Sequence, residues 1–178
     1  TTLRFQPSDE IIDAIVFDYE TLSNRFREMA FLNKGLRIVL TDRRADHADE
    51  EGNPVHEDFL YADGLRDYVR ILTGTRDVIN PTIISLEAHR PEEGMGLEIA
   101  MQWNTSYTTS VHTFANAINT IEGGAHEEGF RAALTSTVNR WGETWGLIKK
   151  REDRVSGDDI REGLTAVVSI KLTEPQFE

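Results

Sequence analysis

The stretch LTAVVSIKL, residues 164–172, most constrains what this chain can fold into. Nearly every residue in it is apolar or β-branched, and such a run favours a central strand of a sheet over an edge strand. A central strand needs other strands beside it and helices packed on the sheet. The sequence therefore predicts a layered domain built around residues 164–172.

Further segments supply strands and helices for this layered domain. Alternating or apolar patterns predict strands at 36–41, 59–61, 83–89, 97–103 and 108–115, and an edge strand at 1–5 whose sheet lies elsewhere. Helical spacing and capping residues predict helices at 18–33, 63–72 and 123–145 and a short one opened by Asp158 and Asp159. The predicted fold class is α/β (α+β), with a mixed sheet of about four strands and helices packed on it.

Composition excludes several classes of protein. The 178 residues allow one good core, and the absence of cysteine excludes disulfides, thiolate metal sites and a cysteine nucleophile. No apolar run approaches the roughly 20 residues needed to span a bilayer, and we expect a cytoplasmic protein that does not engage a membrane. The net charge of −12 argues against a surface coated with nucleic-acid-binding charge.

Both ends of the sequence have the pattern of a cut chain. TTLRF, residues 1–5, lacks an initiator Met and already has the pattern of a strand, while TEPQFE, residues 173–178, is turn-like. We therefore expect a fragment of a longer protein.

The stretch IEGGAHEEGF, residues 121–130, is a candidate chemical site. A zinc site pairs ligands at positions i and i+4, but Phe130 stands four residues after His126. The two glycines lack the lysine and hydroxyl residue of a phosphate loop. We favour a glycine turn followed by an acidic first helical turn, and we expect no metal site.

Paired carboxylates in SGDDIREG, residues 156–163, offer a second candidate site. Two acids can divide the roles of general acid and general base. The same residues fit the capped first turn of a helix, and this structural interpretation is favoured.

A local excess of basic residues lies between Gly129 and Arg154. Six basic residues oppose three acidic ones there, a net of +3 in a chain of −12. A positive strip indicates nucleic-acid binding weakly, and charge alone favours an ordinary solvated helix face. The six are Arg131, Arg140, Lys149, Lys150, Arg151 and Arg154.

Four longer motifs resemble the B subunits of DNA gyrase, which belong to the type IIA topoisomerases. They are EMAFLNKGLRIVLTDRR (28–44), IAMQWN (99–104), EGGAHEEGFRAALTSTVNRW (122–141) and GDDIREGLTAVVSIKLTEPQFE (157–178). Their order matches that of the family, and the likeness covers nearly the whole chain. The B subunit of topoisomerase IV shares most of them and is the close alternative. The chain departs from the family at Gln6, Ala117 and Ala125, which weakens local hydrogen bonding.

The resemblance implies a division into two parts. Residues 1–14 would be the last strand and the exit of an N-terminal ATP-binding domain, and residues 15–178 would be a transducer domain. The transducer is of the ribosomal-protein domain-2-like type, with a βαβ unit of left-handed crossover. It would end before the family's Gln-Thr-Lys loop.

The resemblance also places the ATP chemistry outside this chain. The family's catalytic glutamate, its magnesium-binding asparagine and its glycine-rich lid precede the equivalent of Thr1. We therefore expect ATP and Mg²⁺ to act in the parent protein, with no catalytic residue and no cofactor bound in this chain alone.

The implied function is energy transduction in an ATP-dependent DNA topoisomerase that couples ATP binding and hydrolysis to dimer closure and strand passage. For gyrase, the expected partners are the gyrase A subunit in an A2B2 heterotetramer, DNA and a second B subunit. Arg131 is the first DNA-facing candidate, and Arg140, Lys149 and Lys150 are weaker ones. A free-standing binding or scaffold domain of the same fold is the alternative of another class.

Overall fold

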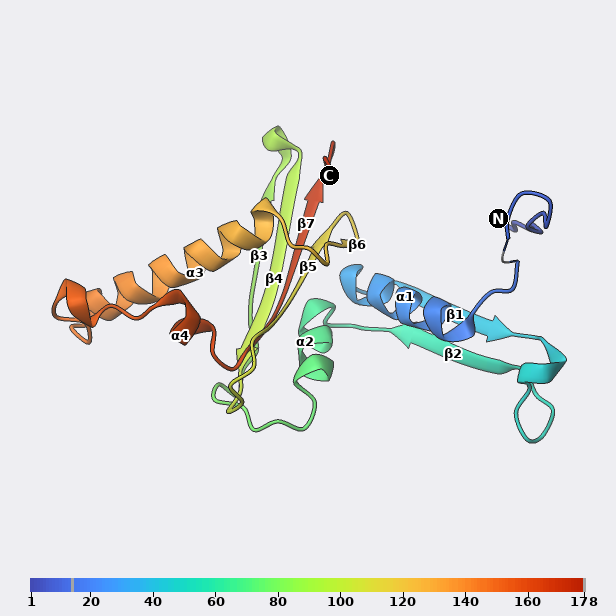
Figure 1. Ribbon diagram of the computed structural model, residues 1–178, viewed down its shortest axis with the longest axis horizontal. Helices are drawn as coiled ribbons and strands as arrows, with labels where there is room; N and C mark the ends of the chain where they lie inside the picture. Colours follow the sequence, from blue (N-terminus) through green and yellow to red (C-terminus); the bar gives the residue numbers. More distant parts are fainter. Residues whose placement is uncertain (14, 178) are drawn as a thin grey trace.

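The computed structural model describes residues 1–13 and 15–177 and has two sheets flanked by helices (Figure 1). The larger sheet has the strand order β3-β4-β7-β5-β6, and the smaller one pairs β1 with β2. The strands are β1 (Arg37–Asp42), β2 (Val55–Leu60), β3 (Ile84–Arg90), β4 (Met95–Trp103), β5 (Ser110–Ala115), β6 (Ile118–Asn119) and β7 (Leu164–Leu172). The helices are α1 (Tyr19–Leu32), α2 (Leu65–Thr73), α3 (Ala125–Thr144) and α4 (Gly157–Arg161), with short 3-10 turns at Ala45–His47, Pro91–Glu93 and Arg151–Asp153.

Strand β7 occupies the centre of the larger sheet, as its apolar sequence predicts. It pairs antiparallel with β4, from Trp103 opposite Leu164 to Met95 opposite Leu172. On its other side it pairs in parallel with β5. Its residues from Leu164 to Ser169 are all buried, so the prediction of a central strand is confirmed.

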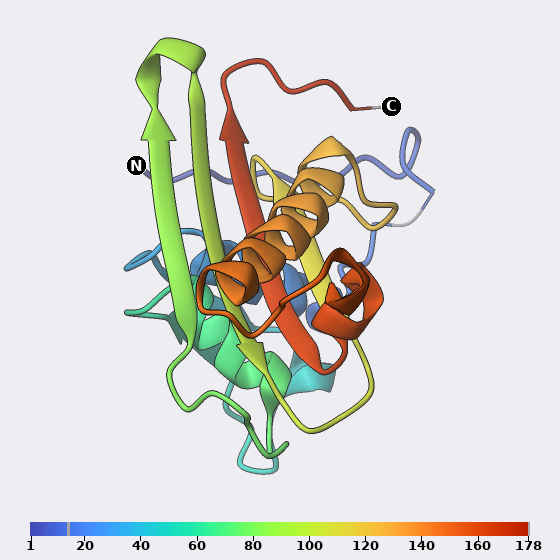
Figure 2. The ribbon, with the colours of Figure 1, turned by 90° about the vertical axis from the view of Figure 1, so that its left-hand side faces the viewer.

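The connection between the parallel strands β5 and β7 crosses over in the left-handed sense. In Figure 2 both strands rise, α3 lies on the near face of the sheet, and the chain passes from β5 on the right to β7 on the left. About 98% of such crossovers are right-handed. The left-handed unit agrees with the fold that the sequence resemblance implies.

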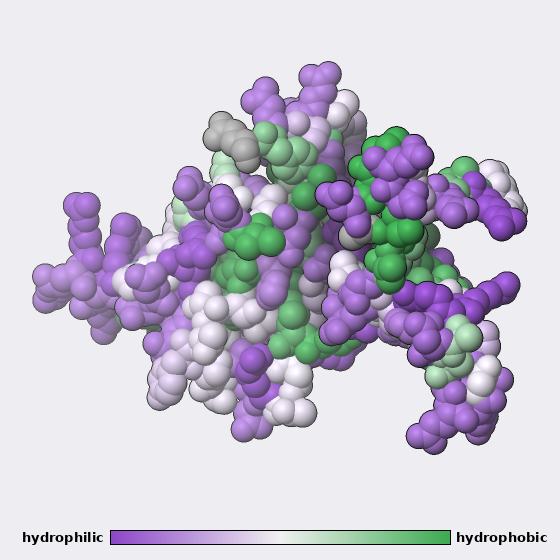
Figure 3. All heavy atoms as spheres, turned by 45° about the vertical axis from the view of Figure 1, so that its right-hand side comes forward, coloured by the Kyte–Doolittle hydropathy of each residue, from purple (hydrophilic) through white to green (hydrophobic). Residues whose placement is uncertain are grey.

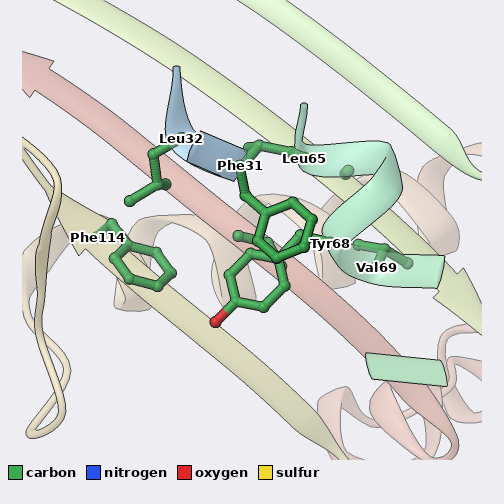
Figure 4. Packing of buried hydrophobic residues seen from close by; sticks show 8 residues of the cluster. Phe31, Leu32, Leu65, Tyr68, Val69 and Phe114 are labelled. Atoms are coloured by element: carbon green, nitrogen blue, oxygen red, sulfur yellow. The ribbon is translucent and has the colours of Figure 1, made fainter. Parts of the chain in front are cut away.

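Helix α2 and the last turn of α1 cover one face of this sheet with a tightly packed core (Figure 4). The ring of Phe31 stacks on Tyr68 with centroids 4.5 Å apart, and Phe114 and Val167 are fully buried beneath them. Burial raises the pKa of Tyr68 to about 12, because the apolar surroundings disfavour the charged phenolate. The end of α1 therefore joins the main core even though the rest of α1 packs on the smaller sheet.

Helices α3 and α4 cover the opposite face less completely. Phe130 and Leu134 of α3 and Ile160 of α4 pack on Ile99 and Val168 of the sheet. The second half of α3 runs away from the sheet in Figure 1.

The helical spacing of Trp141 suggests a residue of the packed face. In the structure its side chain is 47% exposed, because the sheet does not reach the second half of α3.

The sheets differ from the predicted arrangement in two respects. The four long predicted strands form one sheet, but the two-residue strand β6 adds a fifth. The predicted strands 36–41 and 59–61 form a separate hairpin under α1. The segment 1–5, predicted as an edge strand whose sheet lies elsewhere, pairs with no strand of the described residues.

One of the predicted helix caps falls on a neighbouring residue. Asp18 caps α1 as predicted, accepting a hydrogen bond from the Thr21 amide at 2.7 Å. Helix α2 starts after Gly64, whose φ of +56° places it in the left-handed region, and not after Asp63. Ser156 caps α4, accepting from the Asp159 amide at 3.2 Å, so Asp158 and Asp159 lie in a capped first helical turn, as predicted.

The acidic loop between β1 and β2 folds back on one buried carboxylate. Asp42 is 7% exposed and accepts hydrogen bonds from the Arg44 side chain and the Arg44 amide. These bonds hold the pKa of the Asp42 carboxyl well below its usual range.

The described residues contain no helix long and apolar enough to cross a membrane.

Candidate functional site along α3

A groove of about 770 Å³ runs along α3, beside the segment that returns to the sheet through α4. Four arginines line this arginine groove, two from α3 and two from the returning segment. The lining residues are Glu128, Arg131, Ala132, Thr135, Ser136, Asn139, Arg140, Glu143, Arg154 and Arg161.

Polar contacts hold the returning segment against α3. The buried Asn139 side chain donates to the Val155 carbonyl at 2.9 Å and accepts from the Val155 amide at 2.9 Å. Gly157 lets α4 approach, because a Cβ there would lie 3.0 Å from the Thr135 hydroxyl and 2.8 Å from the Arg161 guanidinium. These contacts hold the returning segment at a fixed distance from α3, so the two sides of the arginine groove keep their spacing.

Three of the four arginines already have an acidic partner. Arg131 pairs with Glu127 at 2.5 Å, Arg154 with Glu143 at 2.7 Å, and Arg161 with Asp158 at 2.8 Å. Arg140 is exposed and forms no ion pair within the part of the chain that the structure describes.

The local charge of the groove is close to neutral. Four arginines face four acids once the partners Glu127 and Asp158 are counted with Glu128 and Glu143. Arg154 and Glu143 are 50% and 40% exposed, and an exposed pair of this kind contributes only about 0–1 kcal/mol. Glu127 and Arg161, in the other two pairs, are only 16% and 12% exposed. Of the three pairs, only Arg154–Glu143 can therefore open at low cost.

The structure brings together two of the four DNA-facing candidates. Arg131 and Arg140 both line the arginine groove, whereas Lys149 and Lys150 lie on the loop after α3, outside the lining. Lys150 pairs with Glu152 at 3.2 Å.

Sequence reasoning did not identify the two arginines from the returning segment as site residues. Arg154 belongs to the basic cluster of the sequence, but nothing in the local pattern marks it as a groove residue. Arg161 lies 30 positions after Arg131, and only the return through α4 brings it to the same groove.

The start of α3 has the glycine turn that the sequence predicts. Gly123 and Gly124 have φ values of +83° and +147°, which favour glycine. The His126 ring contacts the Thr120 hydroxyl at 3.0 Å, and the Glu127 carboxylate accepts a hydrogen bond from Arg131. Within residues 1–13 and 15–177, no group of three or more histidine or acidic side chains could hold a metal ion.

Comparisons with known proteins place this fold and sequence in a family. The family described as DNA gyrase B matches residues 64–178, which is more than half of the chain. The chain belongs to the DNA gyrase B family. It is 49% identical to the DNA gyrase B subunit of Micrococcus luteus and 48% identical to that of Streptomyces coelicolor, over its whole length in both cases. It spans 29% and 28% of the length of these two relatives.

Solved structures agree with this membership. The 43K ATPase domain of Thermus thermophilus gyrase B, in complex with an aminocoumarin, superposes with a TM-score of 0.81 at 31% identity, covering 97% of this chain and 44% of that one. The B-subunit of Myxococcus xanthus DNA gyrase gives a TM-score of 0.74 at 25% identity, covering 93% and 43%. A topoisomerase IV ATP binding domain of Francisella tularensis shares the fold at 22% identity and a TM-score of 0.70, covering 96% and 43%.

A second surface of this DNA gyrase B family chain is aromatic. Trp141 lies in the last part of α3 and Trp145 is the residue that follows the helix; their ring centroids are 5.5 Å apart, and they are 47% and 69% exposed. Leu147, in the loop that follows, is also exposed. The second half of α3 thus presents an apolar strip in addition to the arginine groove.

The N-terminal segment exposes a third surface, which is strongly apolar. Figure 3 shows hydrophobic surface gathered in the upper right of the view, where the N-terminal segment lies. Seven large apolar side chains in the first 17 residues are exposed: Leu3, Phe5, Ile11, Ile12, Ile15, Val16 and Phe17. So many exposed apolar side chains in one segment are typical of a contact surface.

Proposed function

We propose that this chain is the energy-transducing part of the ATPase region of an ATP-dependent type IIA DNA topoisomerase. Its membership of the DNA gyrase B family is the observation that carries this proposal. In the parent protein, ATP binding and hydrolysis would drive closure of two B subunits and passage of a DNA segment. The gyrase A subunit, in an A2B2 heterotetramer, would complete a cytoplasmic machine that introduces negative supercoils.

The proposed domain division is supported by the apolar N-terminal segment. Residues 1–14 would belong to the last strand and exit of the ATP-binding domain, and residues 15–178 to the transducer. Phe5 is 71% exposed and Ile11 is 83% exposed, which suits burial against another domain.

ATP and Mg²⁺ are assigned to the parent protein and not to this chain. The described residues offer no converging set of acidic or histidine ligands for a cation. They also lack a glycine-rich phosphate loop with its lysine. Because the resemblance places the family's catalytic glutamate and magnesium-binding asparagine before the equivalent of Thr1, we propose no step of nucleotide chemistry for side chains of this chain. Its part is to transmit force through β7, a strand buried on both faces.

The arginine groove is the proposed DNA-facing surface. Arg131 and Arg140 lie on α3 with guanidinium groups that suit phosphate oxygens. Their neighbours Arg154 and Arg161 extend the same surface. Lys149 and Lys150 would add long-range attraction at the end of the helix.

Replacing Arg131 tests the DNA-facing proposal in the full-length parent. We expect Arg131→Gln to lower the ratio of ATP turnover with DNA to turnover without it by about fivefold, because one phosphate contact is lost. Steady-state ATPase assays with and without linear duplex DNA measure this ratio at a fixed salt concentration.

Arg25→Gln is the matched control for this experiment. Arg25 is 39% exposed and pairs with Glu28 on α1, much as Arg131 is 43% exposed and pairs with Glu127 on α3. An unchanged ratio in Arg131→Gln, or an equal loss in both variants, would remove Arg131 from the DNA-facing surface.

Topology assays with the full-length parent and its gyrase A partner distinguish the proposed activity from its alternatives. Negative supercoiling of relaxed plasmid in the presence of ATP identifies gyrase. Decatenation or relaxation without supercoiling identifies topoisomerase IV. A parent with no ATP-dependent topoisomerase activity would leave the free-standing binding or scaffold domain as the function.

A further inference from the structure

The end of β7 is held by side chains as well as by the strand ladder. The Asn116 side chain donates to the Leu172 carbonyl at 2.7 Å and accepts from the Leu172 amide at 2.7 Å. The Asn116 amide also donates to the Ile170 carbonyl at 2.9 Å. A single asparagine thus continues the β5–β7 pairing beyond the end of β5.

The opposite edge of β7 is fixed at the same level. Thr173, the first residue after β7, donates from its amide to the Gly94 carbonyl at 3.1 Å. Its hydroxyl reaches the same carbonyl at 3.2 Å. The direction in which the chain leaves β7 is therefore set from both sides.

The turn that carries Asn116 adopts an uncommon backbone conformation. Asn116 and Ala117 have φ values of +47° and +64°, and they link β5 to β6 as a two-residue hairpin turn. Asparagine tolerates this region, but alanine does so only when surrounding contacts impose it. The two bonds between Asn116 and Leu172 supply such contacts.

The other end of this hairpin is bonded to the start of α3. The Thr120 hydroxyl donates to the Thr113 carbonyl at 2.9 Å and contacts the His126 ring at 3.0 Å. The next residue of α3, Glu127, holds Arg131. A continuous set of contacts therefore runs from the exit of β7, through the β5–β6 hairpin, to the arginine groove.

We propose that Asn116 is a positioning residue that couples the segment leaving β7 to the first turn of α3 through the β5–β6 hairpin. This inference rests on the proposed function and on the family resemblance, which implies that a Gln-Thr-Lys loop follows β7 and reaches the γ-phosphate of ATP with its lysine, while DNA contacts α3. A shift of the chain beyond β7 moves Asn116, and the hairpin passes that shift to Thr120 and to the helix that carries Arg131. Linkage then requires DNA bound at α3 to change the affinity for nucleotide by the same factor by which nucleotide changes the affinity for DNA.

Asn116→Gly in the full-length parent tests this coupling. Glycine adopts the required φ without strain but removes both side-chain bonds to Leu172. We expect DNA stimulation of ATP turnover to fall by about fivefold or more, within the range typical of coupling between sites. The affinity for a non-hydrolysable ATP analogue should also lose its dependence on DNA, which a purely structural defect would not cause.

Ala117→Gly is the matched control, because it relaxes the same turn and keeps both bonds of Asn116. It should retain DNA stimulation. If Asn116→Gly does not fold in a thermal unfolding assay, Thr120→Val cuts the same path at the His126 contact and should give the same loss.

Three results would separate the proposals. Wild-type stimulation together with DNA-dependent nucleotide affinity in Asn116→Gly overturns the coupling role. An equal loss in Asn116→Gly and Ala117→Gly also overturns it, because the turn and not the side chain would then matter. A wild-type parent without ATP-dependent topoisomerase activity overturns the proposed function itself.

Discussion

The two faces of the five-stranded sheet are covered to different extents, although the same strands supply both. Successive residues of β7 alternate between them, so that Val167 packs toward α1 and α2 while Val168 packs toward α3. The first face is closed by stacked rings and fully buried aliphatic side chains. The second keeps an apolar groove of about 340 Å³ between α3 and the sheet.

The closed face therefore contributes rigidity to the domain, whereas the partly open face leaves room for a helix to move. A closed face resists any change in volume, because its side chains have no free space around them. A partly open face lets a helix shift with smaller losses of contact. The helix on the open face is α3, the one that carries Arg131 and Arg140.

Truncating one leucine on each face should expose the difference most strongly. We expect Leu65→Ala on the closed face to cost about 4 kcal/mol, and Leu134→Ala on the α3 face to cost about 2 kcal/mol. Leu65 is 1% exposed, whereas Leu134 is 9% exposed and borders the apolar groove. Urea unfolding followed by circular dichroism measures both costs. Equal costs would mean that the apolar groove is closed in solution.

Enlarging one alanine on each face should give effects of opposite sign. Ala100 is fully buried on the closed face, so Ala100→Leu should destabilise the chain by about 2 kcal/mol through overpacking. Ala133 lines the apolar groove, so Ala133→Leu should raise the free energy of unfolding of the chain by up to about 1 kcal/mol. The same unfolding assay serves for both variants. A destabilised Ala133→Leu would contradict the open face.

Acidification should destabilise the closed face, by less than the leucine and alanine substitutions do. Burial lowers the pKa of His112, which lies beside the Tyr68 ring. Because the unfolded chain binds this proton near pH 6.5, stability is full above that pH and falls as pH drops toward the folded pKa. The wild type should therefore lose more stability between pH 7 and pH 5 than His112→Gln. If the melting temperatures of the wild type and of His112→Gln fall equally between pH 7 and pH 5, His112 is excluded as the cause.

The sequence was most informative where one local pattern dominates. The apolar run of β7 and the Asp18 cap were predicted correctly, because β-branched runs and capping side chains act over a few residues. Gly64 displaced the predicted cap at Asp63, since its left-handed backbone begins the helix one position later. The two-residue strand β6 is too short for any periodic pattern.

The candidate site was less accessible to sequence reasoning. Arg131 came from a family resemblance, and its groove neighbour Arg161 had no signal of its own. Two asparagines decide how the distant segments meet: Asn139 bonds to Val155, and Asn116 bonds to Leu172. Asparagines that bond to a distant backbone have no characteristic spacing in a sequence, so only the structure could identify them.

The position of β7 has a consequence for how this protein is made. A ribosome releases β3, β4, β5 and β6 well before the strand that lies between β4 and β5. Until β7 emerges, the two neighbouring hairpins share no partner, and their apolar faces stay open to water or to other chains. Contacts that span so much sequence form slowly, and such intermediates are prone to aggregation. The nascent chain should therefore be most prone to aggregation before residue 172 has left the exit tunnel.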